Sequence, residues 1–185
     1  SVGADTLIAI ESARFGGDFY ARFFNADGSE AEMCGNGTRC VARWAYETGM
    51  AKETMVIETI AGKVPAKRLD PRTYQVQLNT PTVFEAEKKL QVDGKPVIMD
   101  YVELGKPGIP HLVVHQPDLA MTELETMIDL AKKLRNHPAF KKGTNVNFYD
   151  LLSDQTVVER TYERGVEDFT LACGTGTGST AYALT

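Results

Sequence analysis

Met33-Cys34-Gly35-Asn36-Gly37-Thr38-Arg39-Cys40 returns in altered form as Ala172-Cys173-Gly174-Thr175-Gly176-Thr177-Gly178, and the expected fold is built around these two runs. Both runs read Cys-Gly-x-Gly-Thr, and each begins where a strand-like alternation gives way to a small-residue helical run. We therefore expect Cys34 and Cys173 at or just before a helix N-terminus. The first turn of a helix has unpaired backbone N–H groups and about half a positive charge, which favour a thiolate and bind a carboxylate.

The glycines of the two runs indicate how a ligand is held. Gly35, Gly37, Gly174 and Gly176 carry no Cβ, so a carboxylate can approach the main-chain donors of two helix N-termini. A helix start lowers the pKa of a thiol from its ordinary value of about 8.5, which makes the thiol a usable base at neutral pH. The pattern predicts proton removal on one face of a carbon and proton return on the other, which is racemisation or epimerisation.

The bulk composition excludes several classes of protein. With 185 residues, of which 43% are hydrophobic, the chain can bury a sizeable core and make one domain or two small ones. A net charge of -5 opposes binding to nucleic acid phosphates. No run reaches the roughly 18 apolar residues of a membrane span, and no signal peptide is evident, so a cytoplasmic protein is expected.

The cysteines and histidines do not predict a disulfide framework or a metal site. The three cysteines are an odd number, Cys34 and Cys40 are too far apart for a Cys-x-x-Cys pair, and the three histidines lack ligand spacing. Cys40 is expected to be a structural cysteine that lies beside Trp44 in the core. No lysine context for pyridoxal is evident, so no cofactor is expected.

Hydrophobic periodicity predicts an alternation of strands and a few helices. Strands are expected at residues 7–10, 18–24, 55–57, 74–78, 89–92, 97–104, 112–115, 145–149 and 157–162. Helices are expected at residues 36–48, with Val41, Trp44 and Ala45 inward, at residues 122–134 behind a Thr122–Glu125 capping box, and after Cys173. Residues 79–86 divide the chain into an N-terminal lobe, 1–85, and a C-terminal lobe, 86–185. The abrupt first and last residues indicate truncation at both ends.

A shift of 139 residues superposes the two Cys-Gly-x-Gly-Thr runs, with Cys34 on Cys173. The same shift places Asn25 on Arg164, and each of these follows a predicted strand directly. Two repeats of one strand, turn and helix unit that face each other across a cleft would bring the two thiols together. We therefore expect a site between two similar lobes.

These residues resemble the diaminopimelate epimerase family, and the resemblance covers nearly the whole chain. Its strongest pieces are Phe24-Asn25-Ala26-Asp27-Gly28-Ser29-Glu30, the run from Cys34 to Cys40, Asn145-Val146-Asn147-Phe148, and Glu163-Arg164-Gly165 with the second cysteine run. The resemblance implies an α+β fold of two pseudo-symmetric lobes. In each lobe a curved mixed sheet or barrel is wrapped around a central helix that carries a cysteine at its N-terminus.

The resemblance also implies roles for particular residues. Cys34 and Cys173 are implied as the two acid/base groups. The donors to the substrate α-carboxylate are implied to be Gly35, Asn36, Gly174 and Thr175. Glu163 and His111 are implied as catalytic, Glu163 by accepting the reacting amino group and His111 by setting the thiol protonation states.

Asn25, Asn145 and Arg164 are implied to bind the distal end of the substrate, where the guanidinium suits a second carboxylate. Taken alone, each residue also has an ordinary structural interpretation. Asn25 is equally a turn residue, Arg164 a solvated surface charge, and His111 a satisfied core histidine.

Two departures from the family pattern leave the substrate open. Ile109 stands where the family usually has Asn, so one polar contact to the distal end is lost, and Thr6 stands where many members have Gln. The upstream Gly-Asn-Asp-Phe strand and the final strands of the family are absent.

The activity that the resemblance implies is conversion of LL- to meso-diaminopimelate by two thiols without a cofactor, in lysine and peptidoglycan precursor synthesis. The partner is then a small amino acid, with a homodimer as one possible assembly and no nucleic acid or membrane. The alternatives are a racemase of another amino acid such as histidine, a non-catalytic amino-acid-binding module and, with less support, a thiol-disulfide oxidoreductase.

Overall fold

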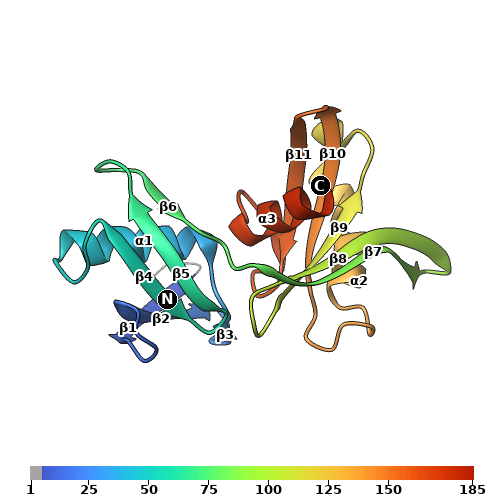
Figure 1. Cartoon of the computed structure of the whole chain (residues 1–185). Helices are drawn as coiled ribbons and strands as arrows, with labels where there is room; N and C mark the ends of the chain where they lie inside the picture. Colours follow the sequence, from blue (N-terminus) through green and yellow to red (C-terminus); the bar gives the residue numbers. More distant parts are fainter. Residues whose placement is uncertain (1–5) are drawn as a thin grey trace. The chain divides into compact units, whose positions relative to one another are not determined.

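The computed structural model describes residues 6–185, which form an α+β fold with two six-stranded mixed sheets (Figure 1). The chain divides into two compact units. The first takes in the described residues up to Thr80 together with Leu104–Ile109, and the second consists of Pro81–Glu103 and Pro110–Thr185. The expected α+β class is confirmed at this level. The Ser1-to-Asp5 opening lies outside the described residues.

The first unit is one sheet with one long helix. Its elements are β1 (Thr6–Ser12), β2 (Phe19–Asn25), β3 (Glu30–Ala31), α1 (Gly35–Glu47), β4 (Thr54–Thr59), β5 (Gly62–Arg68) and β6 (Tyr74–Val76). The strand order is β1-β2-β4-β5-β6, with β3 paired to β2. Strands β2 and β4 run parallel and the other pairs antiparallel, so α1 is the connection that a parallel pair requires.

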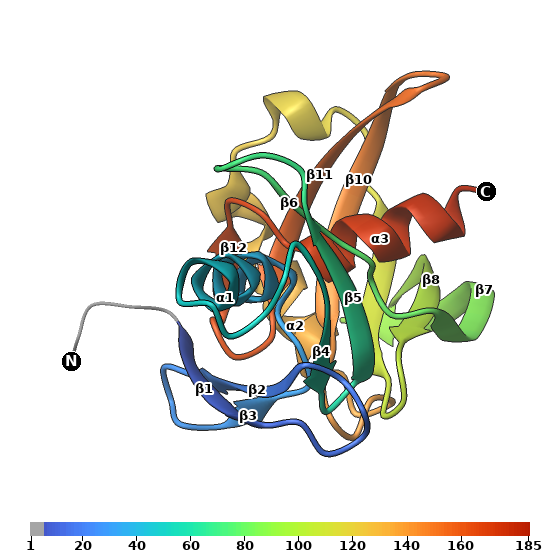
Figure 2. The same cartoon turned by 60° about the vertical axis from the view of Figure 1, so that its left-hand side comes forward.

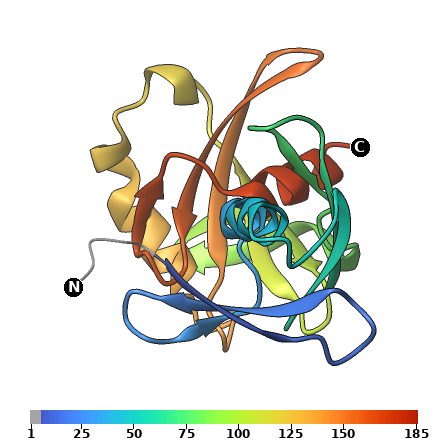
Figure 3. The ribbon, with the colours of Figure 1, turned by 90° about the vertical axis from the view of Figure 1, so that its left-hand side faces the viewer.

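Helix α1 packs its apolar side on the curved sheet of its own unit. It contacts β1, β2, β4, β5 and β6, and Figure 3 shows the helix nearly end-on with these strands around it. Val41, Ala42 and Ala45 are buried in a core that also contains Phe19 and Ile57. The helix ends as expected before Gly49, whose φ of 76° suits a residue without a Cβ.

A buried carboxylate holds the loop between β1 and β2. Glu58, on β4, is 1% exposed and accepts hydrogen bonds from the backbone N–H groups of Arg14 (2.6 Å), Phe15 (2.8 Å) and Gly17 (2.6 Å). Burial by itself raises the pKa of this carboxyl, but the three N–H donors and Lys63 outweigh it, so the pKa lies below its ordinary value. The pattern of the sequence did not indicate this residue.

The second unit contains the second sheet and two helices. Its elements are β7 (Pro81–Val92), β8 (Lys95–Leu104), β9 (Ile109–His115), the 3₁₀ turns η1 (Leu119–Met121) and η2 (Leu124–Met127), α2 (Ile128–Arg135), β10 (Asn145–Ser153), β11 (Thr156–Glu163), β12 (Asp168–Thr170) and α3 (Gly174–Ala183). The strand order is β12-β11-β10-β9-β8-β7. Strands β9 and β10 run parallel, so β10 lies between a parallel neighbour and its antiparallel hairpin partner β11.

Two expectations about helices are wrong. The Thr122–Glu125 capping box does not form, because the Thr122 hydroxyl donates to the carbonyl of Asp118 and α2 begins only at Ile128. Its inward residues Met127, Ala131 and Leu134 are nevertheless buried. Cys40 is exposed rather than buried, and Trp44 is 45% exposed. Both line a shallow apolar pocket with Val41 on the side of α1 that faces β1, instead of lying in the core.

The remaining differences between expectation and structure concern segments that are far apart in the sequence but belong to the same unit. The twelve-residue β7 begins at Pro81, within the segment expected to separate two lobes. Residues 104–109 then return to the first unit, which no sequence pattern indicated. Among the described residues, no helix is long and apolar enough to cross a membrane.

Candidate active site

Both predicted thiols lie at the N-caps of helices, as the repeated motif indicated. Cys34 precedes α1 with φ -131° and ψ 116°, and Cys173 precedes α3 with φ -125° and ψ 105°. The Cys34 sulfur accepts the N–H of Gly37 at 3.4 Å, and the Cys173 sulfur accepts the N–H of Gly176 at 3.3 Å. Each sulfur therefore takes the place that a Ser or Asp oxygen usually has in a helix cap.

The threonine that ends each motif completes the cap. The N–H and hydroxyl of Thr38 bind the carbonyl of Cys34 at 2.8 and 2.7 Å. The N–H and hydroxyl of Thr177 bind the carbonyl of Cys173 at 2.9 and 3.1 Å. The two copies of Cys-Gly-x-Gly-Thr thus build the same local structure twice.

The second glycine of each motif faces the protein and not a ligand. A Cβ on Gly37 would lie 3.0 Å from the Phe23 ring and 3.1 Å from Ile8. A Cβ on Gly176 would lie 2.3 Å from the Asn147 Oδ1 and 2.9 Å from the Thr161 hydroxyl. The expectation that these glycines make room for a ligand is wrong, because their space is taken by strands that support the helix. The first glycines, Gly35 and Gly174, begin α1 and α3.

The pKa of Cys173 is raised to about 12, not lowered. Burial of the sulfur is the main cause, and the negative charge of Glu163 acts in the same direction. These effects outweigh the cap hydrogen bond from Gly176 and the 3.5 Å contact with the Thr175 hydroxyl. Cys173 is therefore a neutral thiol in this state, the form that donates a proton.

Glu163 and Arg164 lie where β11 enters a tight turn. The Glu163 carboxylate accepts a hydrogen bond from the Thr170 hydroxyl across the β11–β12 hairpin. The backbone N–H of Arg164 donates to the Asn145 Oδ1 at 2.9 Å, and the guanidinium is half-buried with a 3.4 Å contact to the Lys142 carbonyl. Arg164 is thus not simply a solvated charge.

His111 and Asn145 lie directly opposite each other on the parallel strands β9 and β10. His111 is fully buried, and burial lowers its pKa to about 3, with the positive charge of Arg164 acting in the same direction. Its imidazole is therefore neutral at physiological pH. The Asn145 Nδ2 donates to the carbonyl of Pro110 at 3.1 Å, so this side chain joins the start of β9 to the turn at Arg164.

The predicted site residues of the first unit lie at the end of β2 and at the start of α1. Asn25 ends β2, and its Nδ2 donates to the Ser29 hydroxyl at 3.0 Å, which is the turn role also considered for it. Asn36 is exposed, and its Oδ1 accepts from Arg39 one turn further along α1. Gly35 is buried at the start of that helix.

The two positions that depart from the family pattern, Ile109 and Thr6, lie in ordinary structural surroundings. Ile109 is 4% exposed and packs in the core of the first unit, so its side chain is a core contact. Thr6 is the first residue of β1 and pairs with Asn25. The structure thus brings His111, Asn145, Glu163, Arg164 and Cys173 into one set of neighbouring elements of the second unit, and Asn25, Cys34, Gly35 and Asn36 lie in the first.

Sequence reasoning missed the residues that support α3. Asn147 and Thr161 are buried beneath its first turn. Glu159, on β11, accepts the hydroxyls of Thr177 (2.8 Å) and Thr180 (2.7 Å), and Figure 2 shows α3 crossing this part of the sheet. One signal was available, since two asparagines alternate with apolar residues at the start of β10, and a buried strand needs partners for such amides.

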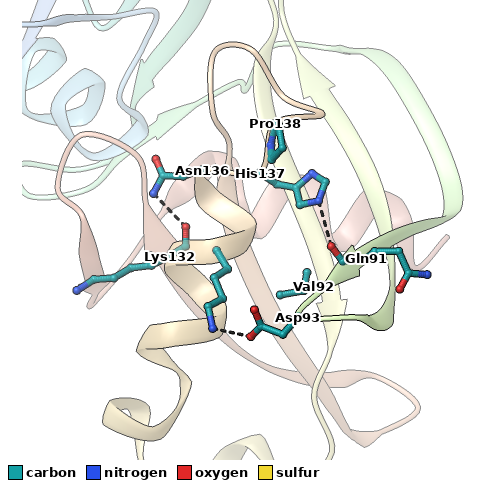
Figure 4. A pocket seen from close by; sticks show the side chains of 8 residues that line it. Gln91, Val92, Asp93, Lys132, Asn136, His137 and Pro138 are labelled. Carbon is teal, nitrogen blue, oxygen red and sulfur yellow. Dashed lines mark hydrogen bonds and ion pairs between the residues drawn. The ribbon is translucent and has the colours of Figure 1, made fainter.

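A pocket of about 490 Å³ in the second unit does not coincide with the predicted site (Figure 4). Residues of β7, α2 and the segment after α2 line it, and there Lys133 binds Asp93 and the His137 ring contacts the Gln91 carbonyl at 3.3 Å. None of its lining residues is a predicted site residue. The capped cysteines stay the predicted site.

Comparison of the sequence with known families and curated proteins yields one family. A family model described as diaminopimelate epimerase matches residues 1–83 and 105–185. The diaminopimelate epimerases of Aquifex aeolicus (strain VF5) and Hydrogenobaculum sp. (strain Y04AAS1) are 47% and 41% identical over 186 and 189 residues. The alignments cover 99% and 100% of this chain but 63% and 67% of those relatives. The chain thus spans about two thirds of the length of the curated relatives it matches.

Solved structures share the fold at low identity. A probable proline racemase from Agrobacterium radiobacter K84, with bound carbonate, superposes with a TM-score of 0.63 at 18% identity, covering 84% of this chain and 53% of that chain. A putative phenazine biosynthesis PhzC/PhzF protein from Clostridium difficile (strain 630) gives a TM-score of 0.52 at 13% identity. The superposition covers 92% of this chain and 62% of that chain. At these identities the likeness concerns the fold alone.

Proposed function

The chain belongs to the diaminopimelate epimerase family, and on that premise we propose that it inverts the α-carbon of diaminopimelate between the LL and meso forms. The reaction would serve lysine and peptidoglycan precursor synthesis. The single observation that carries the proposal is the twofold construction of a cysteine at a helix N-cap, with the same bonds to the Gly and Thr of each motif.

The proposed chemistry is a proton exchange between one carbon and two sulfurs. In one direction Cys34, as thiolate, removes the α-proton while the Cys173 thiol donates a proton to the opposite face. The bond from carbon to hydrogen breaks on one side and forms on the other, and the reverse reaction exchanges the two roles. The raised pKa of Cys173 supports its role as the donor in this direction.

The positive ends of the two helices would stabilise the charge that develops on the α-carboxylate. The first N–H groups of a helix have no intrahelical acceptor, and in α1 and α3 these belong to Gly35, Asn36, Gly174 and Thr175. Fixed dipoles in a site closed to water are the largest usual source of such stabilisation. This assignment requires residues 1–85 and 86–185 to act as two lobes around one substrate, which stays a prediction.

The distal end of the substrate would be bound by Arg164 with Asn25 and Asn145. The half-buried guanidinium of Arg164 can bind a carboxylate with two hydrogen bonds. Both oxygen and nitrogen of the Asn145 amide are already used within the protein, so Asn145 would also hold the Arg164 turn in place. The negative charge of Glu163 raises the pKa of Cys173. In the proposed complex, Glu163 would accept a hydrogen bond from the reacting α-amino group.

The test is exchange of the α-proton in deuterated water. We expect deuterium to enter LL- and meso-diaminopimelate with the wild-type chain, and Cys34→Ala or Cys173→Ala to abolish epimerisation. Cys40→Ala is the matched control, because Cys40 is exposed on α1 and has no place in the proposed site. Full turnover by either Cys34→Ala or Cys173→Ala would refute the two-thiol scheme.

The same assay separates the alternatives. A panel that includes histidine would reveal a racemase of another amino acid, which the Ile109 and Thr6 departures leave open. Tight binding of diaminopimelate with no deuterium incorporation would instead show an amino-acid-binding module. Ile109 packs in the core of the first unit, so its side chain does not itself favour a different substrate.

A further inference from the structure

Two amides on one side of β10 connect three neighbouring strands. Asn145 and Asn147 are two residues apart, so their side chains point to the same face of the sheet. Asn145 joins Pro110 to Arg164 through its amide nitrogen and oxygen. Asn147, which is fully buried, uses its carboxamide to join β9 to β11 beneath the first turn of α3.

The orientation of the Asn147 amide follows from its partners. One end lies 2.9 Å from the carbonyl of Leu112, which can only accept a hydrogen bond, so that end is the NH₂ group. The other end then is the oxygen, and it accepts the Thr161 hydroxyl at 3.0 Å. A flipped amide would place its oxygen against the Leu112 carbonyl, which excludes the alternative.

This orientation decides the state of His111. The second hydrogen of the Asn147 Nδ2 is directed at the His111 Nδ1, 3.1 Å away. The Nδ1 must therefore be an acceptor without a proton, and the proton of the neutral ring is on Nε2. An imidazolium would place the Nδ1 hydrogen against the Asn147 NH₂ group, so a charged ring could keep its hydrogen bond with Asn147 only if the amide turned and gave up its bonds to Leu112 and Thr161.

The Nε2 atom of His111 is buried without a hydrogen-bond partner among the residues that the structure describes. It is a donor, because the proton is on this nitrogen. A buried donor without an acceptor is unfavourable, and in a native protein such a donor finds its acceptor on a ligand, an ion or an ordered water. The positive charge of the Arg164 guanidinium lowers the pKa of His111. A guanidinium has only hydrogen-bond donors, so it cannot supply the acceptor.

We propose that Asn147 is a positioning residue that holds His111 as the Nε2–H tautomer, so that the ring presents a neutral N–H donor to an acceptor atom of the bound amino acid. The carboxylate oxygens and the free amine of an amino acid are such acceptors. The ligand part of this inference rests on the proposed function, whereas the tautomer does not depend on it. His111 would then act on the substrate as a hydrogen-bond donor and not as a cation.

Long-range proton–nitrogen NMR of the imidazole rings tests the tautomer in the wild-type chain. Only three histidines contribute signals, and His115→Gln and His137→Gln assign two of them. We expect His111 to show the Nε2–H pattern without change between pH 5 and 8. An Nδ1–H pattern, or a cation in this range, would overturn the proposal without any variant of Asn147.

Asn147→Asp tests the role of the amide. A carboxylate is an acceptor at both oxygens, so we expect the His111 proton to move to Nδ1 and the ring to begin to titrate. Asn136→Asp makes the same chemical change on the exposed end of α2, beside His137, and is the matched control. An Nε2–H pattern retained in a folded Asn147→Asp variant would show that Asn147 does not position the ring.

Titration with meso-diaminopimelate tests the ligand part. We expect saturation to shift the His111 Nε2–H signal while the signals of the exposed His115 and the half-buried His137 stay in place, and an unchanged His111 signal at saturation would overturn it. In the exchange assay, Asn147→Asp should lose about 10²-fold in rate, the loss that a misplacement of about 1 Å can cause. Absence of binding and exchange in the wild type would refute the proposed function, and the tautomer measurement would still decide the role of Asn147.

Discussion

A Cβ on Gly176 would stand 2.3 Å from the Oδ1 of Asn147, closer than any real Cβ contact. The first turn of α3 is therefore seated directly on a buried amide of β10. Because the same turn carries Cys173 as its cap, the position of the sulfur depends on this contact. The motif glycine is thus needed for the fit between helix and sheet.

Gly176→Ala should displace the start of α3. We expect a loss of about 1–3 kcal/mol in the free energy of unfolding from overpacking, and a loss of about 10²-fold in α-proton exchange because the thiol moves. Gly37→Ala is the matched variant in the other motif, where the added Cβ meets only the Phe23 ring at 3.0 Å and the Ile8 side chain at 3.1 Å. Urea denaturation should rank Gly176→Ala as the more damaging, and the reverse order would contradict this account.

Cys173 should react slowly with iodoacetamide, because burial and the charge of Glu163 raise its thiol pKa to about 12 and little thiolate exists at pH 8. Glu163→Gln removes the nearby charge, so the pKa should fall and alkylation should accelerate. Peptide mass spectrometry measures the rate at each cysteine, with the exposed Cys40 as an internal reference. Equal rates at Cys173 in wild type and variant would rule out the electrostatic coupling.

Glu58→Gln should lower the urea midpoint at pH 7, since the amide cannot accept all three N–H groups of the loop. The folded pKa lies below the ordinary value of 4.5, so the contribution of this carboxylate is present above pH 4.5 and is lost as the pH falls through the folded pKa. The difference between wild type and variant should therefore shrink toward pH 3. Glu53→Gln, at an exposed glutamate, is the control and should show a small difference at every pH.

Ile109→Asn should destabilise the first unit by about 3 kcal/mol, because it buries an amide in place of an apolar side chain. Ile109→Val, which keeps the apolar contact, should cost about 1 kcal/mol. Urea denaturation of the two variants makes the comparison. A neutral Ile109→Asn would mean that this side chain contacts ligand or solvent instead of the core in which it packs.

Local patterns in the sequence predicted the local structure well. The change from alternation to helical spacing placed Cys34 and Cys173 at helix N-caps, and the α+β class was implied by the family resemblance. These features depend on residues within about ten positions of one another. The helix before Pro138 was predicted six residues too early, because Thr122 bonds back to Asp118 and not forward along the helix.

Features that depend on distant segments were not predictable. Glu58 is buried because a loop some forty residues earlier supplies backbone N–H groups that bind its carboxylate. Asn147 forms a hydrogen bond with His111, which lies thirty-six residues away in the sequence. The rise in the Cys173 pKa likewise comes from burial and from Glu163 at the end of β11, whereas the sequence shows only the helix start. The roles assigned to the site residues stay predictions until the exchange assay is done.

Trp44 is the only tryptophan in the chain, and it lies half-exposed on α1 in the first unit. Fluorescence excited selectively at tryptophan therefore reports the melting of that unit on heating, whereas circular dichroism in the far ultraviolet follows both. If the two traces coincide, the units melt as one cooperative body, and if they separate, each half of the molecule has a transition of its own.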